Sequence, residues 1–182
     1  MKMNLPNKLT ILRIFMIPFF VLFLLNDNIP YNNIIAVVIF AIACITDALD
    51  GHIARKNNLI SNFGKFMDPL ADKLLVCSAF ICFVEKGLMP SWVVIIIISR
   101  EFIISGFRLI AVDNGVVIAA SVWGKFKTIV QMVMSILLIV NFDNAVFNVL
   151  EQVSIYAALL LTVISLVDYL IKNKDVLSER SN

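Results

Sequence analysis

The feature that most constrains this chain is a series of long apolar stretches that have no polar face. Clear examples are the segments 34–45, 92–99 and 129–141. A helix that is apolar all round is surrounded by lipid or by other parts of the protein, whereas a helix at a water-facing surface has one polar side. Hydrophobic residues make up 60% of the chain and its mean hydropathy is +0.94, so we expect an integral membrane protein.

The length sets the number of helices. A membrane-crossing helix needs about 20 residues, so a chain of 182 residues holds about six of them with short loops. The apolar stretches predict an all-α fold with six transmembrane helices near residues 10–26, 33–56, 62–84, 91–112, 122–142 and 152–172. We expect one membrane-embedded domain over residues 1–182. The N-terminal stretch is predicted to be its first helix and no signal peptide, because a turn at 26–30 follows it.

The loops between these helices alternate in charge. Loops 26–32 and 141–151 contain no Lys or Arg, and loop 85–90 contains one, Lys86. The opposite helix ends carry most of the basic residues: Lys2, Lys8, Arg13, Arg55, Lys56, Lys65, Lys125, Lys127, Lys172, Lys174 and Arg180. Since positive residues mark the cytoplasmic side, both termini are predicted to be cytoplasmic.

Ionisable residues inside the predicted helices also gather at these cytoplasmic ends. Each of them is costly in a bilayer, at about 2.5–3.5 kcal/mol on insertion scales. Their placement predicts a polar cavity that opens to the cytoplasm and is closed at the other face, as an enzyme of the cell membrane with a lipid substrate needs. The net charge of +2 is too small to indicate a nucleic-acid partner.

Four aspartates stand where the second predicted helix ends and the third begins. Asp47 and Asp50 share one helix face, and Asp68 and Asp72 share another. The short polar segment 56–63 makes the two helices antiparallel neighbours, so the acidic faces can meet. Four carboxylates in a low-dielectric site cannot all stay ionised without cations.

Carboxylate oxygens suit Mg²⁺ or Mn²⁺. Two such ions about 3.5–4 Å apart form a clamp for phosphoryl displacement. A pair of acids alone would fit a proton relay or a water-filled cavity equally well. The small residues Gly51 and Ala54 and the cation Arg55 at fixed offsets favour the metal site.

The full pattern is D-x2-D-G-x2-A-R-x8-G-x3-D-x3-D, and it resembles the signature of the CDP-alcohol phosphotransferase family. Its fixed positions are Asp47, Asp50, Gly51, Ala54, Arg55, Gly64, Asp68 and Asp72. The resemblance implies a six-helix membrane fold that is commonly dimeric. It also implies cleavage of a CDP-linked lipid or alcohol with release of CMP, and dependence on two Mg²⁺ or Mn²⁺ ions.

The resemblance also implies a role for each position of the motif. Asp47, Asp50 and Asp68 correspond to metal ligands, and Asp72 to the general base, which also lies near the metals. The remaining positions correspond to the pocket for the cytidine diphosphate of the CDP-lipid: Gly51, Ala54, Arg55 and Gly64.

Members of the family differ in the acceptor alcohol, and an acceptor with its own phosphate needs further cations. The candidate acceptor-phosphate residues are Arg100, Arg108, Lys125, Lys127 and Lys65. The alternative is that these residues anchor the protein to anionic lipid. That alternative explains Arg100 and Arg108 less well, because they lie deeper in an apolar context. Glu101 is expected either near the metals or paired with one of these arginines.

Three flanking segments, 4–19, 99–101 and 123–132, resemble bacterial phosphatidylglycerophosphate synthases. This resemblance implies CDP-diacylglycerol as donor and glycerol 3-phosphate as acceptor. Thr10 and Arg13 are expected to help seat the CDP-lipid, with a helix cap and an interfacial anchor as their alternatives. Phe107–Gly115 departs from the pattern of those enzymes, which leaves the acceptor contacts there open.

Other functions stay possible at this point. The same chemistry could use phosphatidylglycerol or inositol phosphate as acceptor. From a different class, a divalent-cation or proton transporter could bind its cargo at the four acids, although transport needs polar groups near the membrane midplane. A membrane scaffold without activity is a further alternative.

Overall fold

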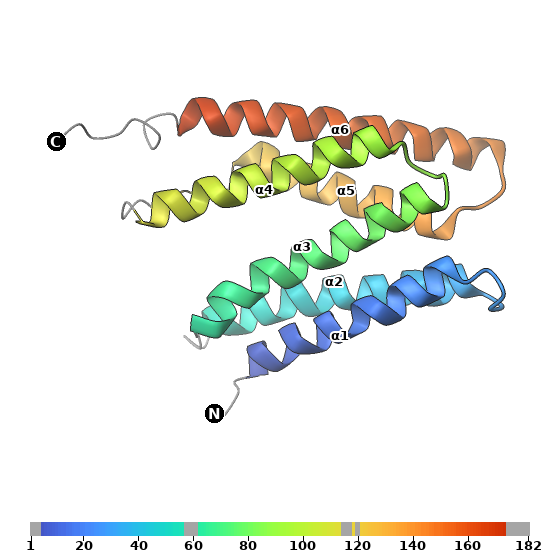
Figure 1. The fold of residues 1–182 in the computed structure, drawn as a ribbon, viewed down its shortest axis with the longest axis horizontal. Helices are drawn as coiled ribbons and strands as arrows, with labels where there is room; N and C mark the ends of the chain where they lie inside the picture. Colours follow the sequence, from blue (N-terminus) through green and yellow to red (C-terminus); the bar gives the residue numbers. More distant parts are fainter. Residues whose placement is uncertain (1–4, 57–61, 114–117, 119–120, 174–182) are drawn as a thin grey trace. The chain divides into compact units, whose positions relative to one another are not determined.

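The structure is a computed structural model that describes residues 5–56, 62–113, 118 and 121–173; the side chains of residues 5, 6, 48, 50–56, 62–66, 69, 112 and 113 lie outside this description. The described chain is all-helical (Figure 1). Its helices are α1 (Leu5–Leu25), α2 (Asn32–Lys56), α3 (Asn62–Glu85), α4 (Ser91–Asp113), α5 (Val122–Val140) and α6 (Ala145–Lys172).

The all-α fold and the helix order are as predicted, and two helix starts differ from the prediction. Helix α1 begins at Leu5, earlier than expected, with Pro6 in the first turn, where its missing N–H costs no hydrogen bond. Helix α6 begins at Ala145, so the predicted loop 141–151 ends with Asn144. The Asn144 side chain caps α6 by accepting a hydrogen bond from the Val146 backbone N–H at 3.0 Å.

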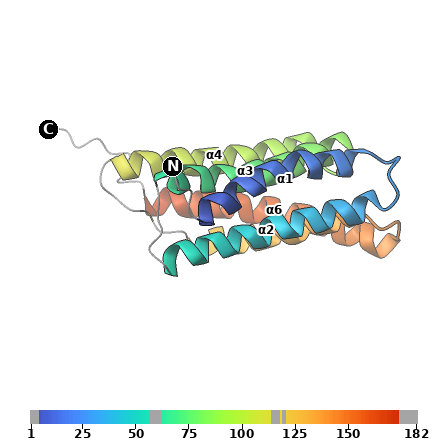
Figure 2. The same ribbon diagram turned by 90° about the horizontal axis from the view of Figure 1, so that it is seen from below.

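The described residues form two compact units, and the first contains α1, α2 and α3. Figures 1 and 2 show these three elongated helices side by side. Helix α1 packs closely against both α2 and α3. The rings of Phe20 and Phe40 meet at 5.6 Å, and the fully buried Ala36 and Ala43 let α2 approach closely. As a result, α1 is the helix on which the first unit is built.

The second unit contains α4, α6 and most of α5. Phe107 of α4 and Tyr169 of α6 pack edge to face with ring centroids 5.9 Å apart, next to the buried Ile104. Gln131 of α5 donates a hydrogen bond to the hydroxyl of Thr162 on α6 at 3.3 Å. Apolar packing therefore joins α4 to α6, and a buried polar contact joins α5 to α6.

Three of the described helices are long and apolar enough to cross a membrane: 7–25 within α1, all of α5 and all of α6. A shorter apolar stretch, Asn32–Asp47, lies in α2. Helix α4 carries Arg100, Glu101 and Arg108 within its length, and α2 and α3 have described side chains over part of their length. The structure is therefore that of a membrane protein, while crossing by all six helices stays a prediction.

A polar contact joins the α1–α2 connection to the end of α3. Helix α3 ends at Glu85, and Gly87, whose φ is +70°, follows it with hydrogen bonds from Gly87 N to Val84 O and from Leu88 N to Phe83 O. The preceding Lys86 donates to the backbone oxygen of Leu24 at 3.2 Å and to Asp27 at 2.7 Å. One ammonium group therefore ties the ends of α1 and α3 together.

This contact predicts a pH effect. The hydrogen bond and the charge of Lys86 hold the pKa of Asp27 below its ordinary value of 3.8. The resulting stabilisation is present above that value and is lost as the pH falls through the lowered pKa. We expect the melting temperature in detergent to fall less in Asp27→Asn than in the wild-type protein between about pH 5 and about pH 2. Identical pH profiles would contradict this contribution.

Candidate active site

Three of the four predicted aspartates have described side chains, and all three lie in the first unit. Asp47 is near the end of α2, while Asp68 and Asp72 lie one turn apart in α3. Asp47 and Asp72 both lie close enough to the Cys44 thiol of α2 to interact with it electrostatically. Acidic side chains of α2 and α3 thus act on the same thiol, while their joint metal site stays a prediction.

Helix α1 supplies hydrogen-bond donors to two of these aspartates. Arg13 Nη1 lies 2.5 Å from Asp47 Oδ1, and Thr10 Oγ1 donates to Asp68 Oδ1 at 2.5 Å. Arg13 and Thr10 are both completely buried, whereas 42% of the Asp47 side chain is exposed. A buried guanidinium in an apolar bundle is strongly unfavourable without a counter-charge, so Asp47 stabilises Arg13 as much as Arg13 orients Asp47.

These contacts correct the alternatives given for Thr10 and Arg13. Thr10 lies beyond the first turn of α1 and is no helix cap. Arg13 has no exposed surface and is no interfacial anchor. Both side chains face acidic residues of the motif, and contact with a CDP-lipid stays a prediction.

Several predicted residues lie outside the described side chains: Asp50, Gly51, Ala54, Arg55, Gly64 and Lys65. Within the described part of the chain, no group of three or more potential ligands lies close enough together to hold a metal ion. The chemistry of the described donors nevertheless fits the expected ions, because Asp47, Asp68 and Asp72 offer carboxylate oxygens alone. A hydrogen bond or ion pair at one oxygen leaves a carboxylate further lone pairs for a cation.

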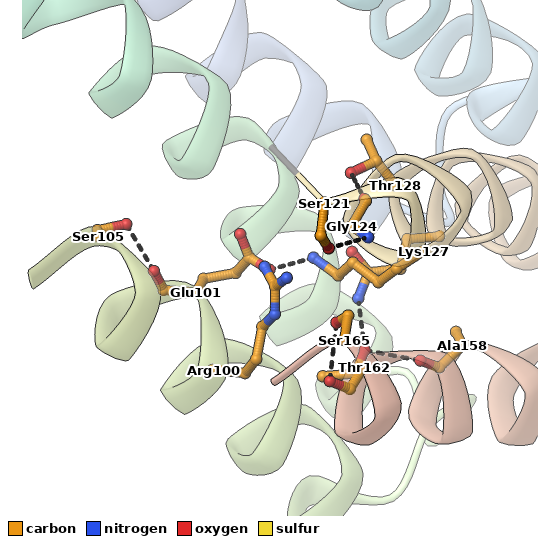
Figure 3. Close-up of polar contacts among 11 residues, drawn as sticks. Arg100, Glu101, Ser105, Ser121, Gly124, Lys127, Thr128, Ala158, Thr162 and Ser165 are labelled. Carbon is orange, nitrogen blue, oxygen red and sulfur yellow. Dashed lines mark hydrogen bonds and ion pairs between the residues drawn. The ribbon is translucent and has the colours of Figure 1, made fainter. Parts of the chain in front are cut away.

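A second polar cluster lies in the other unit and consists of Arg100, Glu101 and Lys127 (Figure 3). Arg100 Nη1 lies 3.1 Å from Glu101 Oε1, and Lys127 Nζ from α5 pairs with the same oxygen. Arg100 and Lys127 are buried, with 8% and 3% of their surface exposed. Two buried cations therefore share one carboxylate, and the three side chains together carry one positive charge.

Arg100 also has a hydrogen-bond donor that this cluster does not use. Its Nε is buried and has no hydrogen-bond partner among the described residues. Gly124 in the first turn of α5 is near by, since a methyl group placed on it would lie 3.7 Å from Arg100 Nη2. The Gly124 N–H already donates to the Ser121 hydroxyl, but the Arg100 guanidinium keeps a donor without a partner. An anion is therefore the kind of ligand that the surroundings of Arg100 favour.

The polar network continues from this cluster along α5 and α6. Gln131, one turn after Lys127, donates to Thr162, and the Thr162 and Ser165 hydroxyls donate to backbone oxygens of α6 (Figure 3). All these side chains are buried. Buried polar groups in an apolar bundle need such partners. The cluster is therefore followed by a row of hydrogen-bonded polar side chains between α5 and α6.

The remaining acceptor candidates are placed differently. Arg108 and Lys125 are exposed, while Arg100 and Lys127 are buried. Glu101 pairs with Arg100 and Lys127, which agrees in part with the expectation that it pairs with an arginine. Its contact with Lys127 crosses from α4 to α5, and helical spacing within one segment gives no signal for such a partner.

The family model and the individual relatives that match this chain indicate the same family. The model of the family described as CDP-alcohol phosphatidyltransferase matches residues 3–164. A protein of Bacillus subtilis named CDP-diacylglycerol--glycerol-3-phosphate 3-phosphatidyltransferase is 43% identical over 96% of this chain and 97% of its own length. A Haemophilus influenzae protein of the same name is 40% identical over 93% of both chains. A probable phosphatidylglycerophosphate synthase of Mycobacterium tuberculosis is 42% identical over 91% of this chain and 79% of its own.

The shared carboxylate of the second cluster predicts a stability effect. Glu101→Gln leaves Arg100 and Lys127 buried without their counter-charge, which should cost about 1–3 kcal/mol of unfolding free energy. The melting temperature in detergent should fall by roughly 2–10 °C. The matched control is Glu85→Gln, because Glu85 is exposed at the end of α3. Equal melting temperatures for Glu101→Gln and the control would contradict a supporting role for Glu101.

Proposed function

Because the chain belongs to the CDP-alcohol phosphatidyltransferase family, we propose that it transfers the phosphatidyl group of CDP-diacylglycerol to glycerol 3-phosphate. The products are phosphatidylglycerophosphate and CMP, so the protein is an enzyme of phospholipid biosynthesis. The observation that carries this proposal is the similarity to relatives named for this reaction over nearly the whole of both chains.

We propose that the aspartates of the motif hold two divalent ions, Mg²⁺ or Mn²⁺. Asp47, Asp50 and Asp68 are the proposed ligands, with Asp72 close to both ions. Such ions neutralise the pyrophosphate of the donor and stabilise the charge of the departing CMP. The oxygen-only donor set supports this assignment. The proposed pocket for the cytidine diphosphate is formed by Gly51, Ala54, Arg55 and Gly64.

Asp72 is the proposed general base. Its side chain is exposed in α3, one turn after Asp68. In the proposed reaction Asp72 takes the proton of the acceptor hydroxyl as that oxygen attacks the phosphorus of the phosphatidyl group. The bond from this phosphorus to the oxygen of CMP breaks, and CMP leaves with the electron pair. No covalent enzyme intermediate is needed.

The cations of the second unit are the proposed site for the phosphate of glycerol 3-phosphate. Arg100 and Lys127 are buried cations whose net charge with Glu101 is positive, and a guanidinium and an ammonium are both phosphate donors. Arg108, Lys125 and Lys65 are the further proposed contacts. The alternative acceptors, phosphatidylglycerol and inositol phosphate, also carry a phosphate, so only an assay separates them.

The membrane arrangement is part of the proposal. We propose one domain over residues 1–182 with six membrane crossings, located in the cell membrane. Both termini and the active site face the cytoplasm, as the placement of Lys and Arg indicates. The expected assembly is a homodimer, which the family resemblance implies. A transporter or a scaffold would release no CMP.

The decisive measurement is CMP release from CDP-diacylglycerol by the purified protein in detergent with Mg²⁺ or Mn²⁺. Glycerol 3-phosphate, phosphatidylglycerol, inositol phosphate and no acceptor are compared. We expect release with glycerol 3-phosphate and none in Asp72→Asn, because the neutral amide cannot accept the proton. Asp143→Asn, in the exposed α5–α6 connection, is the control that retains activity.

Each departure from this result has a definite meaning. CMP release with another acceptor alone would keep the donor chemistry and exclude glycerol 3-phosphate. Full activity in Asp72→Asn would exclude Asp72 as the base. A lack of CMP release with every acceptor would contradict the proposed enzymatic activity. A flux assay in vesicles would then test transport of divalent ions.

The acceptor site makes a separate kinetic prediction. Arg108→Ala and Lys125→Ala each remove an exposed cation, so both should raise the KM for glycerol 3-phosphate. A loss of about 1–3 kcal/mol per charged contact corresponds to roughly 5- to 150-fold. The KM for CDP-diacylglycerol should change little. Lys172→Ala, on the exposed end of α6, is the control. A defect confined to CDP-diacylglycerol would contradict the acceptor assignment.

A further inference from the structure

Helix α1 contributes no aspartate to the motif, yet it contacts the aspartates of both other helices in its unit. Thr10 and Arg13 are three residues apart and therefore share one face of α1. Thr10 reaches Asp68 of α3, and Arg13 reaches Asp47 of α2. These two contacts link residues that are 58 and 34 positions apart in the sequence.

The hydroxyl of Thr10 differs from other hydroxyl groups in the described helices. Ser105, Thr128, Ser135 and Thr162 each donate to the backbone oxygen four residues earlier in their own helix. This is the usual way for Ser and Thr to satisfy their proton inside a helix. Thr10 donates to a carboxylate of another helix at 2.5 Å, so its contact restrains the direction of the Asp68 carboxylate.

Arg13 restrains Asp47 by charge as well as by direction. A guanidinium is planar and always charged, so its N–H groups donate along fixed directions. The whole side chain is buried, with none of its surface exposed, and packing therefore limits its movement. The Asp47 carboxylate, which is partly exposed, is held through its Oδ1 by this buried guanidinium.

We propose that Thr10 and Arg13 are positioning residues that hold Asp68 and Asp47 in the orientation needed to bind divalent ions. This proposal rests on the proposed function of those aspartates as metal ligands. Groups that hydrogen-bond to a metal ligand typically change metal affinity or activity by 10- to 100-fold when they are removed. Thr10 and Arg13 then support the binding of the CDP-lipid through the aspartates that they orient.

The test is the binding of Mn²⁺ alone to the purified protein in detergent, followed by electron paramagnetic resonance, together with the melting temperature. Thr10→Val keeps the shape of the side chain and removes the hydroxyl, whereas Thr10→Ser keeps the hydroxyl. We expect Thr10→Val to raise the Mn²⁺ dissociation constant by roughly 10-fold or more, and Thr10→Ser to bind Mn²⁺ like the wild type. Thr128→Val is the matched control, because that hydroxyl is exposed and donates within its own helix.

Arg13→Lys tests the second contact. Lysine keeps the charge that compensates Asp47 but lacks the planar donor group. We expect weaker Mn²⁺ binding in Arg13→Lys than in the wild type, with a smaller change in melting temperature than in Arg13→Met. In Thr10→Val and Arg13→Lys, the Mn²⁺ concentration needed for half-maximal activity should rise, and activity should recover as Mn²⁺ is increased.

Two results would overturn the proposal. The first is Mn²⁺ binding in Thr10→Val and Arg13→Lys equal to that of the wild type. The second is a loss of binding that follows the melting temperature and occurs equally in Thr10→Ser, because that pattern indicates a role in folding alone. Asp68→Asn distinguishes a failure of the positioning role from a failure of the metal-ligand assignment. If Asp68→Asn loses Mn²⁺ binding while Thr10→Val and Arg13→Lys keep it, Asp68 is a metal ligand and the positioning role is wrong. If Asp68→Asn binds Mn²⁺ normally, the assignment of Asp68 as a ligand fails.

Discussion

The buried ion pair between Arg13 and Asp47 sets the conditions for the rest of the first unit. A bundle of apolar helices offers no water to solvate a guanidinium, so the charge of Arg13 has to be compensated by another part of the protein. The compensating carboxylate comes from α2, which therefore packs on α1 through small residues such as Ala43, one turn from Asp47. The buried charge of Arg13 in α1 is thus met by Asp47, which lies in the acidic part of α2.

The second unit meets the same constraint with two buried cations instead of one. Arg100 and Lys127 are buried cations, and one carboxylate, Glu101, compensates them in part. The hydrogen bond between Gln131 and Thr162 extends this polar region between α5 and α6. In both units buried cations pair with carboxylates of the same unit, while apolar residues cover the outer faces of the same helices.

Much of this organisation could be predicted from the sequence. The positions of the helices follow from the apolar stretches, and the family follows from the spacing of eight motif residues between Asp47 and Asp72. The early start of α6 was missed, because Asn144 is equally typical of a turn and of a helix cap. The partners of Thr10, Arg13 and Lys127 could not be predicted, because each contact joins different helices and depends on how those helices pack. Residues that resemble caps or membrane anchors in the sequence therefore lie buried against acidic groups.

The proposed function would use both clusters, because their net charges have opposite signs. In the first unit, three described aspartates and Arg13 leave an excess of negative charge, which binding of divalent cations would relieve. In the second, Arg100, Lys127 and Glu101 leave an excess of positive charge, which binding of a phosphate would relieve. A phosphatidyl transfer between two phosphate-bearing substrates needs both kinds of site, since the pyrophosphate of the donor requires metal ions and the acceptor phosphate requires basic side chains. The charge of each cluster thus agrees with the ligand proposed for it, metal ions in the first unit and the acceptor phosphate in the second.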